Sequence, residues 1–503
     1  MKVKSLSVAL TLALAAMAAV VSVTPVASAA AERTYLILYM EQALPSDATA
    51  TVRAAAGTVV ASYPQIGVVV ARSSNDAFAA TLERDPLIYG VAPTARLAVR
   101  PAWLDIHGAA DAARNDTADP LVAADDTLSD RQWDMDQIHA PEAHEIQAGS
   151  RTVVVGDIDT GLDFTHPDIA PNYDAANSAD CTSGTPTALL PGNDRNGHGT
   201  HTAGTIAAAE DGIGIVGVAP NVKIAGIKSS NDDGFFFPEM VVCSFMWAGT
   251  HGIDVTNNSY FADPWYFNCK NDPGQRAIWI AEQRAIRFAM QRGTVVVAAS
   301  GNFRDDLAHP TRDVISPDFP PGSEQARTIT NACAVIPVEV PGVVGVNANG
   351  NQEIKSFYSN YGLGVSDVIA PGGDSLFFTQ SPTVPNGRVL STWPAAILAD
   401  CPRPVVEAGR TYCYLQGTSM ASPHVTGVAA LIRSQFPGMS GGAVAGRLFN
   451  TADPMACPTA EEMERYEAFP SVSNGEPQVC TGGAGYNSFN GHGQVNALAA
   501  VGG

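Results

Sequence analysis

From about residue 129 onward, the chain alternates short apolar runs with longer helical patterns. Most of the runs are β-branched and bounded by Gly, Asn or Pro, as strands buried on both faces of a parallel sheet are. Helical patterns separate several of them, notably over residues 275–292 and 421–435. This alternation predicts an α/β fold with a mainly parallel central sheet. The predicted strands are Thr152–Val155, Val222–Ile227, Gly252–Val255, Thr294–Ala299, Val343–Val346 and Ser366–Ile369.

Residues 30–100 predict a separate, smaller unit. Strand-like runs and helical stretches follow one another there in the order βαββαβ, which is typical of a two-layer α+β (ferredoxin-like) sandwich with an antiparallel sheet. Residues 101–130 are rich in Asp and Ala without clear periodicity, so we expect an acidic linker before a larger domain at 131–503. The expected strands and helices are Thr34–Met40, Ser46–Ala55, Gly57–Tyr63, Gly67–Ala71, Asn75–Arg84 and Leu87–Val91.

Residues 1–29 have the three parts of a secretory signal peptide. Lys2 and Lys4 form a basic start, an apolar run covers residues 6–23, and Ala27-Ser28-Ala29 supplies a small-residue cleavage site. The alternative is an uncleaved membrane anchor, because the run is long for a signal, but the Ala-x-Ala site favours cleavage. We therefore expect a secreted protein that has no membrane contact once the signal is removed.

Overall composition excludes two further classes. The net charge is −21, and a negative chain repels phosphate backbones, so nucleic acid is excluded as a partner. Hydrophobic residues make up 46% and charged residues 16%, which excludes intrinsic disorder for most of the chain.

The eight cysteines agree with export. An even count in a secreted chain predicts disulfides, although eight cysteines allow 105 connectivities. None has the Cys-x-x-Cys spacing of a zinc site. Proximity in the sequence favours the pairs Cys401–Cys413, Cys243–Cys269 and Cys457–Cys480, which leaves Cys181 with Cys333.

Three glycine-flanked segments each place one reactive side chain at the end of a predicted element. Asp159 lies in VVVGDIDTG, His198 in NGHGTH, and Ser419 in GTSMASPH. A serine hydroxyl needs an adjacent base to act as a nucleophile, an imidazole can take its proton, and a carboxylate orients that imidazole. A helix that begins at Ser419 also directs backbone N–H groups toward an oxyanion formed there.

Each segment alone has another interpretation. The Asp-Thr-Gly triplet at 159–161 is also found in aspartic proteases, but the chain has no second such triplet. The acids between 157 and 168 fall at intervals like those of a calcium loop, but the glycine is one place early and a strand precedes them. His198 and His201 lack the glutamate of a His-Glu-x-x-His zinc helix. The three matches together, in the order Asp, His, Ser, favour nucleophilic serine catalysis.

From about Gln132 to Ala500 the chain resembles the subtilisin-like serine proteases (subtilases). The resemblance implies that Asp159, His198 and Ser419 form a catalytic triad. The segment VVVAASGN ends at Asn302, which by resemblance completes the oxyanion hole with Ser419. We therefore expect a subtilisin-like three-layer fold and a serine endopeptidase without a catalytic cofactor.

The unit at 33–95 resembles the inhibitory propeptide of the family, which also assists folding. This implies a zymogen cut between about Arg100 and Asp130, with the propeptide as an intramolecular partner and proteins or peptides as substrates. We expect a monomer. The family alternatives are a broad secreted endopeptidase used for nutrition and a maturation protease for a few exported proteins. A catalytically inactive homologue that serves as a binding module is a third alternative.

Secreted subtilases commonly bind structural calcium, and the resemblance extends to such positions. It implies side-chain ligation by Asp168 and Asp211, with a hydrogen-bonded turn that binds no metal as the alternative. The backbone carbonyls of Ala209, Ile213 and Ile215 would complete most of the ligand shell.

The substrate is expected to lie as an extended strand between two segments. Because the borders of the pocket carry no acid, we expect Leu, Phe, Tyr or Met before the scissile bond, unless an inserted loop supplies Asp305 or Asp306. Asp232 and Asp233 are expected to favour basic residues only at outer subsites. The substrate-binding residues implied by the resemblance are Gly234, Phe235, Phe236, Ser259, Tyr260, Ala299, Ser300, Gly301 and Phe303.

The chain also departs from the family. Asp157 stands where an apolar strand residue is usual, on the same face of the strand as Asp159. The spacings between the three catalytic residues are long, which predicts extra loops near 170–195, 303–342 and 373–412.

Overall fold

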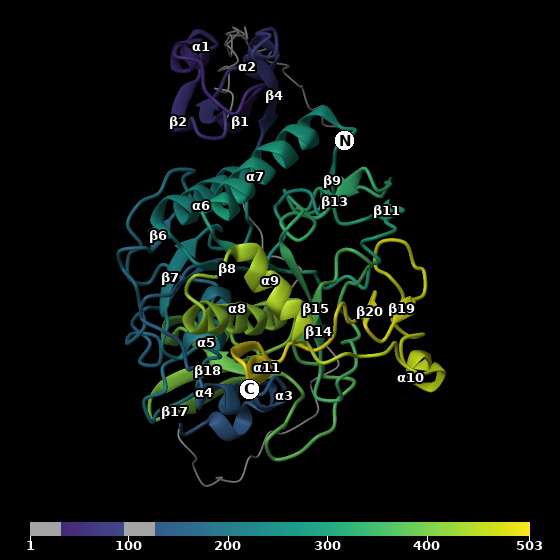
Figure 1. The fold of residues 1–503 in the computed structure, drawn as a ribbon. Helices are drawn as coiled ribbons and strands as arrows, with labels where there is room; N and C mark the ends of the chain where they lie inside the picture. The colour runs from purple at the N-terminus through teal and green to yellow at the C-terminus, as the bar shows by residue number, and fades with distance from the viewer. Residues whose placement is uncertain (1–31, 95–125) are drawn as a thin grey trace, which may run out of the picture.

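The computed structural model describes residues 32–94 and 126–503, which form a small N-terminal unit (33–94) and a large α/β unit (Figure 1). The predicted signal segment and most of the predicted linker lie outside the described residues. None of the helices in the described part of the chain has the length and apolar character that crossing a bilayer requires.

The N-terminal unit has the expected βαββαβ order. Its four strands form an antiparallel sheet in the order β2-β3-β1-β4. Alternate residues of β1 serve different faces: Tyr35 and Ile37 pack under α1 and α2, whereas Leu36 and Leu38 point to the opposite face. The elements are β1 (Arg33–Tyr39), α1 (Ala48–Ala54), β2 (Thr58–Tyr63), β3 (Val68–Ser73), α2 (Phe78–Leu82) and β4 (Ile88–Pro93).

A seven-stranded parallel sheet organises the large unit, in the order β15-β14-β10-β8-β5-β7-β6. The α/β prediction is confirmed, but several strands run further than their apolar patterns, because their carboxyl ends carry polar residues such as Asp159 and Asn258. The strands are β5 (Val154–Asp159), β6 (Ala179–Asp180), β7 (Lys223–Lys228), β8 (Val255–Asn258), β10 (Val295–Ala299), β14 (Val344–Asn349) and β15 (Val368–Pro371).

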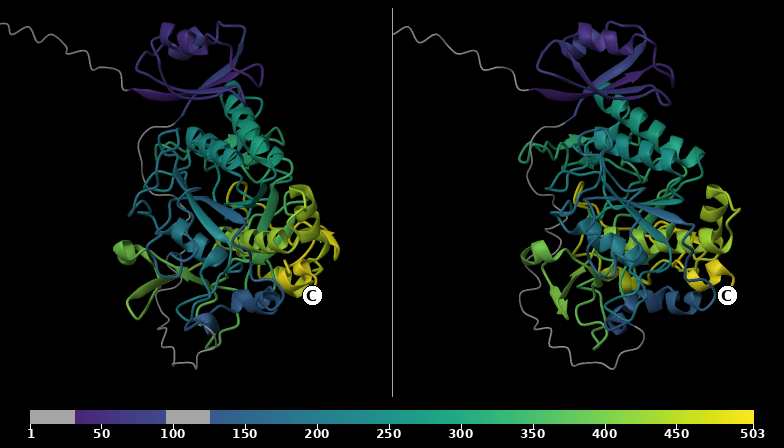
Figure 2. Two further views of the ribbon diagram at one scale, coloured as in Figure 1. Left: turned by 60° about the vertical axis from the view of Figure 1, so that its left-hand side comes forward. Right: turned by 90° about the vertical axis from the view of Figure 1, so that its left-hand side faces the viewer.

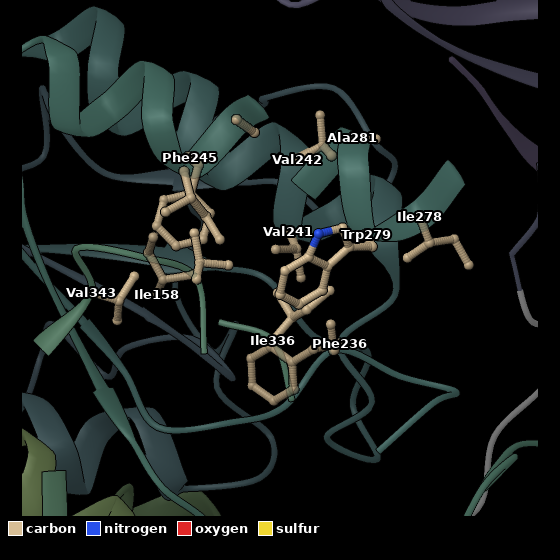
Figure 3. Packing of buried hydrophobic residues seen from close by; sticks show 14 of the residues in the cluster. Ile158, Phe236, Val241, Val242, Phe245, Ile278, Trp279, Ala281, Ile336 and Val343 are labelled. Atoms are coloured by element: carbon tan, nitrogen blue, oxygen red, sulfur yellow. The ribbon is translucent and has the colours of Figure 1, made fainter. Parts of the chain in front are cut away.

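Helices cover both faces of this sheet, which gives three layers (Figure 2). On one face, α6 (Pro238–His251) and α7 (Pro273–Gln291) bury a cluster that includes Ile158 of β5 and Trp279 of α7 (Figure 3). The opposite face packs against the other helices, which share a second hydrophobic cluster with Val155. These are α5 (His198–Ala207), α8 (Thr418–Gln435), α9 (Gly441–Asn450) and α11 (Ala497–Val501).

The predicted extra loops contain short elements of their own. The 303–342 region has β11 (Arg312–Asp313), β12 (Arg327–Thr328) and β13 (Cys333–Ala334), the last paired with β9 (Asn268–Cys269). The 373–412 region contributes a three-stranded sheet beside α5. Its elements are β16 (Val389–Thr392), η3 (Ala395–Asp400), β17 (Pro404–Glu407) and β18 (Arg410–Leu415). The remaining elements are η2 (Ser129–Arg131), α3 (Trp133–Gln137), α4 (Ala140–His144), α10 (Ala460–Glu464), β19 (Gly482–Gly483) and β20 (Tyr486–Asn487).

The N-terminal unit lies against α7 of the large unit, at one end of the molecule (Figure 2). The open face of its sheet joins the same hydrophobic cluster as α6 and α7. Arg284 of α7 donates hydrogen bonds to the carbonyl oxygens of Tyr39, Met40 and Ile66 at 3.0 Å each. Tyr63 donates to the carbonyl oxygen of Gly184 at 2.7 Å. The guanidinium of Arg284 and the phenol of Tyr63 therefore add directional hydrogen bonds to this apolar contact.

The disulfides confirm two of the four expected pairs and correct the others. Cys401–Cys413 and Cys457–Cys480 are present. The predictions Cys243–Cys269 and Cys181–Cys333 are wrong, because distance along the chain does not reflect the sheet topology. β9 and β13 place Cys269 directly opposite Cys333, to which it is bonded. Cys181, beside the edge strand β6, is bonded to Cys243 on α6.

Candidate active site

Asp159 and His198 meet where β5 ends and α5 begins. Nδ1 of His198 lies 2.7 Å from Oδ1 of Asp159, and both residues are buried. The same oxygen accepts the N–H of Thr160 at 2.7 Å. The carboxylate therefore fixes the imidazole through one ring nitrogen, which leaves Nε2 for a different partner.

Ser419 lies in the first turn of α8 and lines the same cleft as His198. Its hydroxyl donates to the carbonyl oxygen of Ser259 at 3.2 Å. Asn302, just after β10, accepts the N–H of Thr418 through its Oδ1 at 2.9 Å. That bond leaves the side-chain N–H₂ of Asn302 free to act as a donor near the backbone N–H of Ser419. Both nitrogens lie close to Gly417: a Cβ atom placed on this glycine would be 3.6 Å from each of them. The two donors thus both lie near Gly417, beside the serine.

The cleft has a volume of about 350 Å³, and all nine residues expected to bind substrate line it. Its walls are largely aromatic; Phe236 stacks on Tyr260 with ring centroids 4.1 Å apart. Phe237 is turned away instead and packs with Phe235 and Phe319. Sequence reasoning missed several lining residues, because the inserted 303–342 loop contributes them through its tertiary position: Val314, Ile315, Asp318, Pro321, Glu324 and Val335.

The acids near the cleft differ from those expected. Asp305 is buried and accepts hydrogen bonds from Ser471 and Ser473, and Asp306 contacts His309 at 2.9 Å; neither lines the cleft. Asp263 and Asp318 do line it. Burial, together with the nearby carboxyl of Asp318, holds the pKa of Asp263 well above its usual range. Burial raises the pKa of Asp318 to about 6.

Asp168, which was expected to bind calcium, already has hydrogen-bond partners in the structure. The Tyr412 hydroxyl lies 3.1 Å from both carboxylate oxygens of Asp168, the position that a cation bound through both oxygens would take. Oδ2 also accepts the N–H of Ile215 at 3.1 Å, and burial raises the pKa of Asp168 to about 7. Asp211 is exposed. A hydrogen-bonded turn describes the arrangement around Asp168 better.

Removing calcium should therefore leave the stability unchanged. We expect the same melting temperature with EDTA and with added calcium, as measured by differential scanning calorimetry. Tyr412→Phe should lower the free energy of unfolding by about 1–3 kcal/mol, because it leaves Oδ1 of the buried Asp168 carboxyl without a donor. A melting temperature that falls in EDTA for the parent protein but not for Asp168→Asn would contradict this interpretation.

Comparison with known proteins identifies the family of the chain. Residues 150–497 match the model of the subtilase family. The chain is 32% identical to subtilisin BL of Lederbergia lenta over 321 residues, which cover 64% of this chain and 90% of that protein. It is 32% identical over the same length to an alkaline protease of Alkalihalobacillus alcalophilus, of which the match covers 64%.

Solved structures have the same fold over a greater length. The crystal structure of fervidolysin from Fervidobacterium pennivorans, a keratinolytic enzyme related to subtilisin, superposes with a TM-score of 0.62 at 26% identity, over 94% of this chain and 61% of that one. The epidermin leader peptide processing protease of Staphylococcus aureus superposes with a TM-score of 0.65 at 21% identity, over 93% and 98% of the two chains; at this identity the likeness concerns the fold alone. The resemblance drawn from the motifs is thus confirmed: the chain belongs to the subtilase family and is a serine endopeptidase.

Proposed function

We propose that this endopeptidase is secreted, is made as a zymogen, and cleaves proteins through an acyl-enzyme formed on Ser419. The observation that carries the proposal is the position of His198, held at 2.7 Å by Asp159 and facing the cleft that Ser419 lines. A base fixed in this way can take the serine proton and later return it to the leaving amine.

The reaction begins when the Ser419 side chain turns from the Ser259 carbonyl toward His198. Oγ attacks the substrate carbonyl carbon while Nε2 takes the hydroxyl proton, and the new imidazolium is stabilised by Asp159. The oxyanion accepts hydrogen bonds from the backbone N–H of Ser419 and the side-chain N–H₂ of Asn302. The C–N bond then breaks, the amine leaves with the proton, and water releases the acyl group by the same steps in reverse.

Ser419→Ala should abolish labelling by a fluorophosphonate and reduce peptide hydrolysis to a small residue, while circular dichroism shows an intact fold. Asn302→Ala should retain labelling but lower kcat by about 10²–10³, the cost of losing one oxyanion-hole donor in a subtilisin. Hydrolysis near the parent rate in Ser419→Ala would show that another residue is the nucleophile.

The cleft supports a preference for apolar residues before the scissile bond. Burying an apolar side chain between its aromatic walls contributes about 1.5–3 kcal/mol, whereas an unpaired cation costs several. Asp263 would stabilise a bound Lys or Arg side chain only weakly, since its carboxyl already accepts the N–H of Phe236 and burial favours its neutral form. Asp318 and Glu324, which both line the cleft, are the acids that would favour a basic residue if the preference were reversed.

This specificity is tested with tetrapeptide anilides that end in Phe or in Arg. We expect kcat/KM to favour Phe, and Asp318→Asn to leave the Phe-to-Arg ratio nearly unchanged. A preference for Arg that disappears in Asp318→Asn would overturn the proposal and assign the specificity to the inserted loop.

The N-terminal unit is proposed to be the inhibitory propeptide, cut by the enzyme itself between about Arg100 and Asp130. Its supports are the βαββαβ fold, the docking on α7, and the exit of β4 toward α6, where Thr94 hydrogen-bonds Glu239. Glu239 is buried, and Gly184 lies between it and Val70 of the N-terminal unit. A Cβ atom placed on Gly184 would be within 3.3 Å of both side chains. On this basis Ser419→Ala should accumulate as the uncut precursor.

Release of the unit should become easier as the pH rises. In the docked state burial raises the pKa of Glu239 to about 7, opposed by a hydrogen bond from Thr94 and by Arg72, whereas an exposed glutamate titrates near 4.3. The docked state therefore holds a proton on Glu239 that the released state loses. The proton's contribution to the affinity of the N-terminal unit for the enzyme is greatest below the ordinary glutamate pKa, and it is lost as the pH rises through about 7.

Size-exclusion chromatography of the processed protein should therefore retain more of the unit on the enzyme at about pH 5 than at about pH 8, by at least about tenfold in affinity. Glu239→Gln should flatten this dependence. Glu145→Gln, which changes an exposed glutamate outside the contact, should keep the dependence and serves as the control. Tighter retention at the higher pH would contradict the assignment.

A further inference from the structure

Asp157 is the departure from the family pattern that the reaction itself leaves unused. It lies two residues before Asp159 on β5, is 1% exposed, and points to the same face of the sheet. Its Oδ2 lies 2.7 Å from Oγ1 of Thr202, and its Oδ1 accepts the side-chain N–H₂ of Asn257 at 2.9 Å. All three residues are at most 1% exposed. A buried carboxyl with two good partners is an ordered contact and does not indicate a packing fault.

Its two partners lead to the two helices that carry the catalytic residues. Thr202 lies one turn after His198 on α5, and its Oγ1 is also 3.1 Å from the carbonyl oxygen of Gly199. Asn257, on β8, accepts the hydroxyl of Ser422 through Oδ1 at 2.7 Å. Ser422 lies one turn after Ser419 on α8. The Asp157 carboxyl is thus the middle of a continuous buried chain of polar groups from α5, across β5 and β8, to α8.

We propose that Asp157 is a positioning residue, which fixes the helix of His198 and the helix of Ser419 at the spacing that proton transfer between them requires. The proposal rests on the proposed function, because it presumes that these two residues react with each other. It concerns geometry only, since Asp157 does not line the cleft.

The proton on Asp157 explains how a second acid can lie beside the triad. Burial and the neighbouring Asp159 raise the pKa of Asp157 well above its usual range, with a smaller contribution from Asp194 in the loop before α5. The partners from β8 and α8 are the uncharged Asn257 and Ser422. As a neutral acid, Asp157 can donate to Thr202, whose own proton then turns to the Gly199 carbonyl. Each polar group in this chain then has a hydrogen-bond partner. A neutral Asp157 adds no second negative charge to that of Asp159 beside His198.

Four variants of the full-length enzyme test the proposal: Asp157→Asn, Asp157→Val, Thr202→Val and the double variant that combines Asp157→Val with Thr202→Val. Asp157→Val and Thr202→Val should each lower kcat by about tenfold to a hundredfold with little change in KM, because each displaces the helices slightly. Asp157→Asn should restore most of the loss, since it is a neutral isostere. The double variant should be less impaired than the sum of the single ones, because both single changes break the same contact between Asp157 and Thr202.

Two further readouts separate positioning from a structural or electrostatic role. The acidic limb of the kcat/KM profile should be unmoved in Asp157→Asn, because a neutral side chain replaces a neutral one. Thr205→Val, a change to another buried threonine of α5 whose hydroxyl donates to the His201 carbonyl, should keep kcat within about twofold. All rates are divided by the fluorophosphonate-titrated site concentration, so that partial unfolding does not count as lost kcat.

The proposal is overturned if Asp157→Val keeps the parent kcat per titrated site, whatever its melting temperature. It is also overturned if Asp157→Asn is as impaired as Asp157→Val, or if its acidic limb moves to lower pH, because Asp157 would then act through a negative charge. Failure of the proposed function would be visible separately, as labelling and hydrolysis that persist in Ser419→Ala.

Discussion

Helix α5 begins against the turn that follows β5, and this approach leaves no room for a side chain. A Cβ on Gly199 would lie 2.2 Å from the carbonyl oxygen of Gly161 and 3.1 Å from Cβ of Asp159. Only glycine permits that contact. It brings the first residue of the helix, His198, within hydrogen-bond distance of the last residue of the strand. The hydrogen bond between Asp159 and His198, the direction of Nε2 and the position of the cleft all depend on this contact.

The parallel sheet brings the remaining parts of the site together. The carboxyl ends of adjacent parallel strands lie along one edge of the sheet, where sites of α/β proteins form. At this edge Asp159 ends β5, Ser259 follows β8, and Asn302 follows β10. Ser419, the proposed nucleophile, comes from α8 and bonds to Ser259, and the preceding Thr418 bonds to Asn302. Ser259 and Ser419 are 160 residues apart in the chain, yet each donates to the carbonyl of the other.

The features that sequence predicted correctly are local. Strand runs, the βαββαβ order and the glycine-flanked segments each depend on residues close in the chain, so the sheet and the residues at its edge could be named in advance. The line of Gly, Phe and Ser residues along the cleft was found by resemblance for the same reason. The strand ends were missed because their polar residues interrupt the apolar pattern.

The features that sequence reasoning missed depend on distant segments. Two disulfides were paired wrongly, since Cys269 meets Cys333 only through the pairing of β9 with β13. Tyr412 reaches Asp168 from 244 residues away, and nothing near Asp168 in the sequence signals that a phenol fills the expected calcium position. The acids of the cleft were sought at 305 and 306, the nearest in sequence to Asn302, whereas folding of the inserted loop brings Asp318 there instead.

The face by which the N-terminal unit rests on α7 has a consequence for the direction of activation. Leu36, Leu38 and Val70 belong to the same hydrophobic cluster as Ala277 and Trp279 of α7, so separation exposes apolar surface on both partners. A domain of about 60 residues is marginally stable even when fully covered, and one with a bare sheet face spends more time open. Once it has separated and unfolded, the N-terminal unit can be cleaved as a substrate by the protease domain. If this unit is the propeptide proposed above, its digestion would remove it from the equilibrium, so that dissociation would proceed only toward the free enzyme.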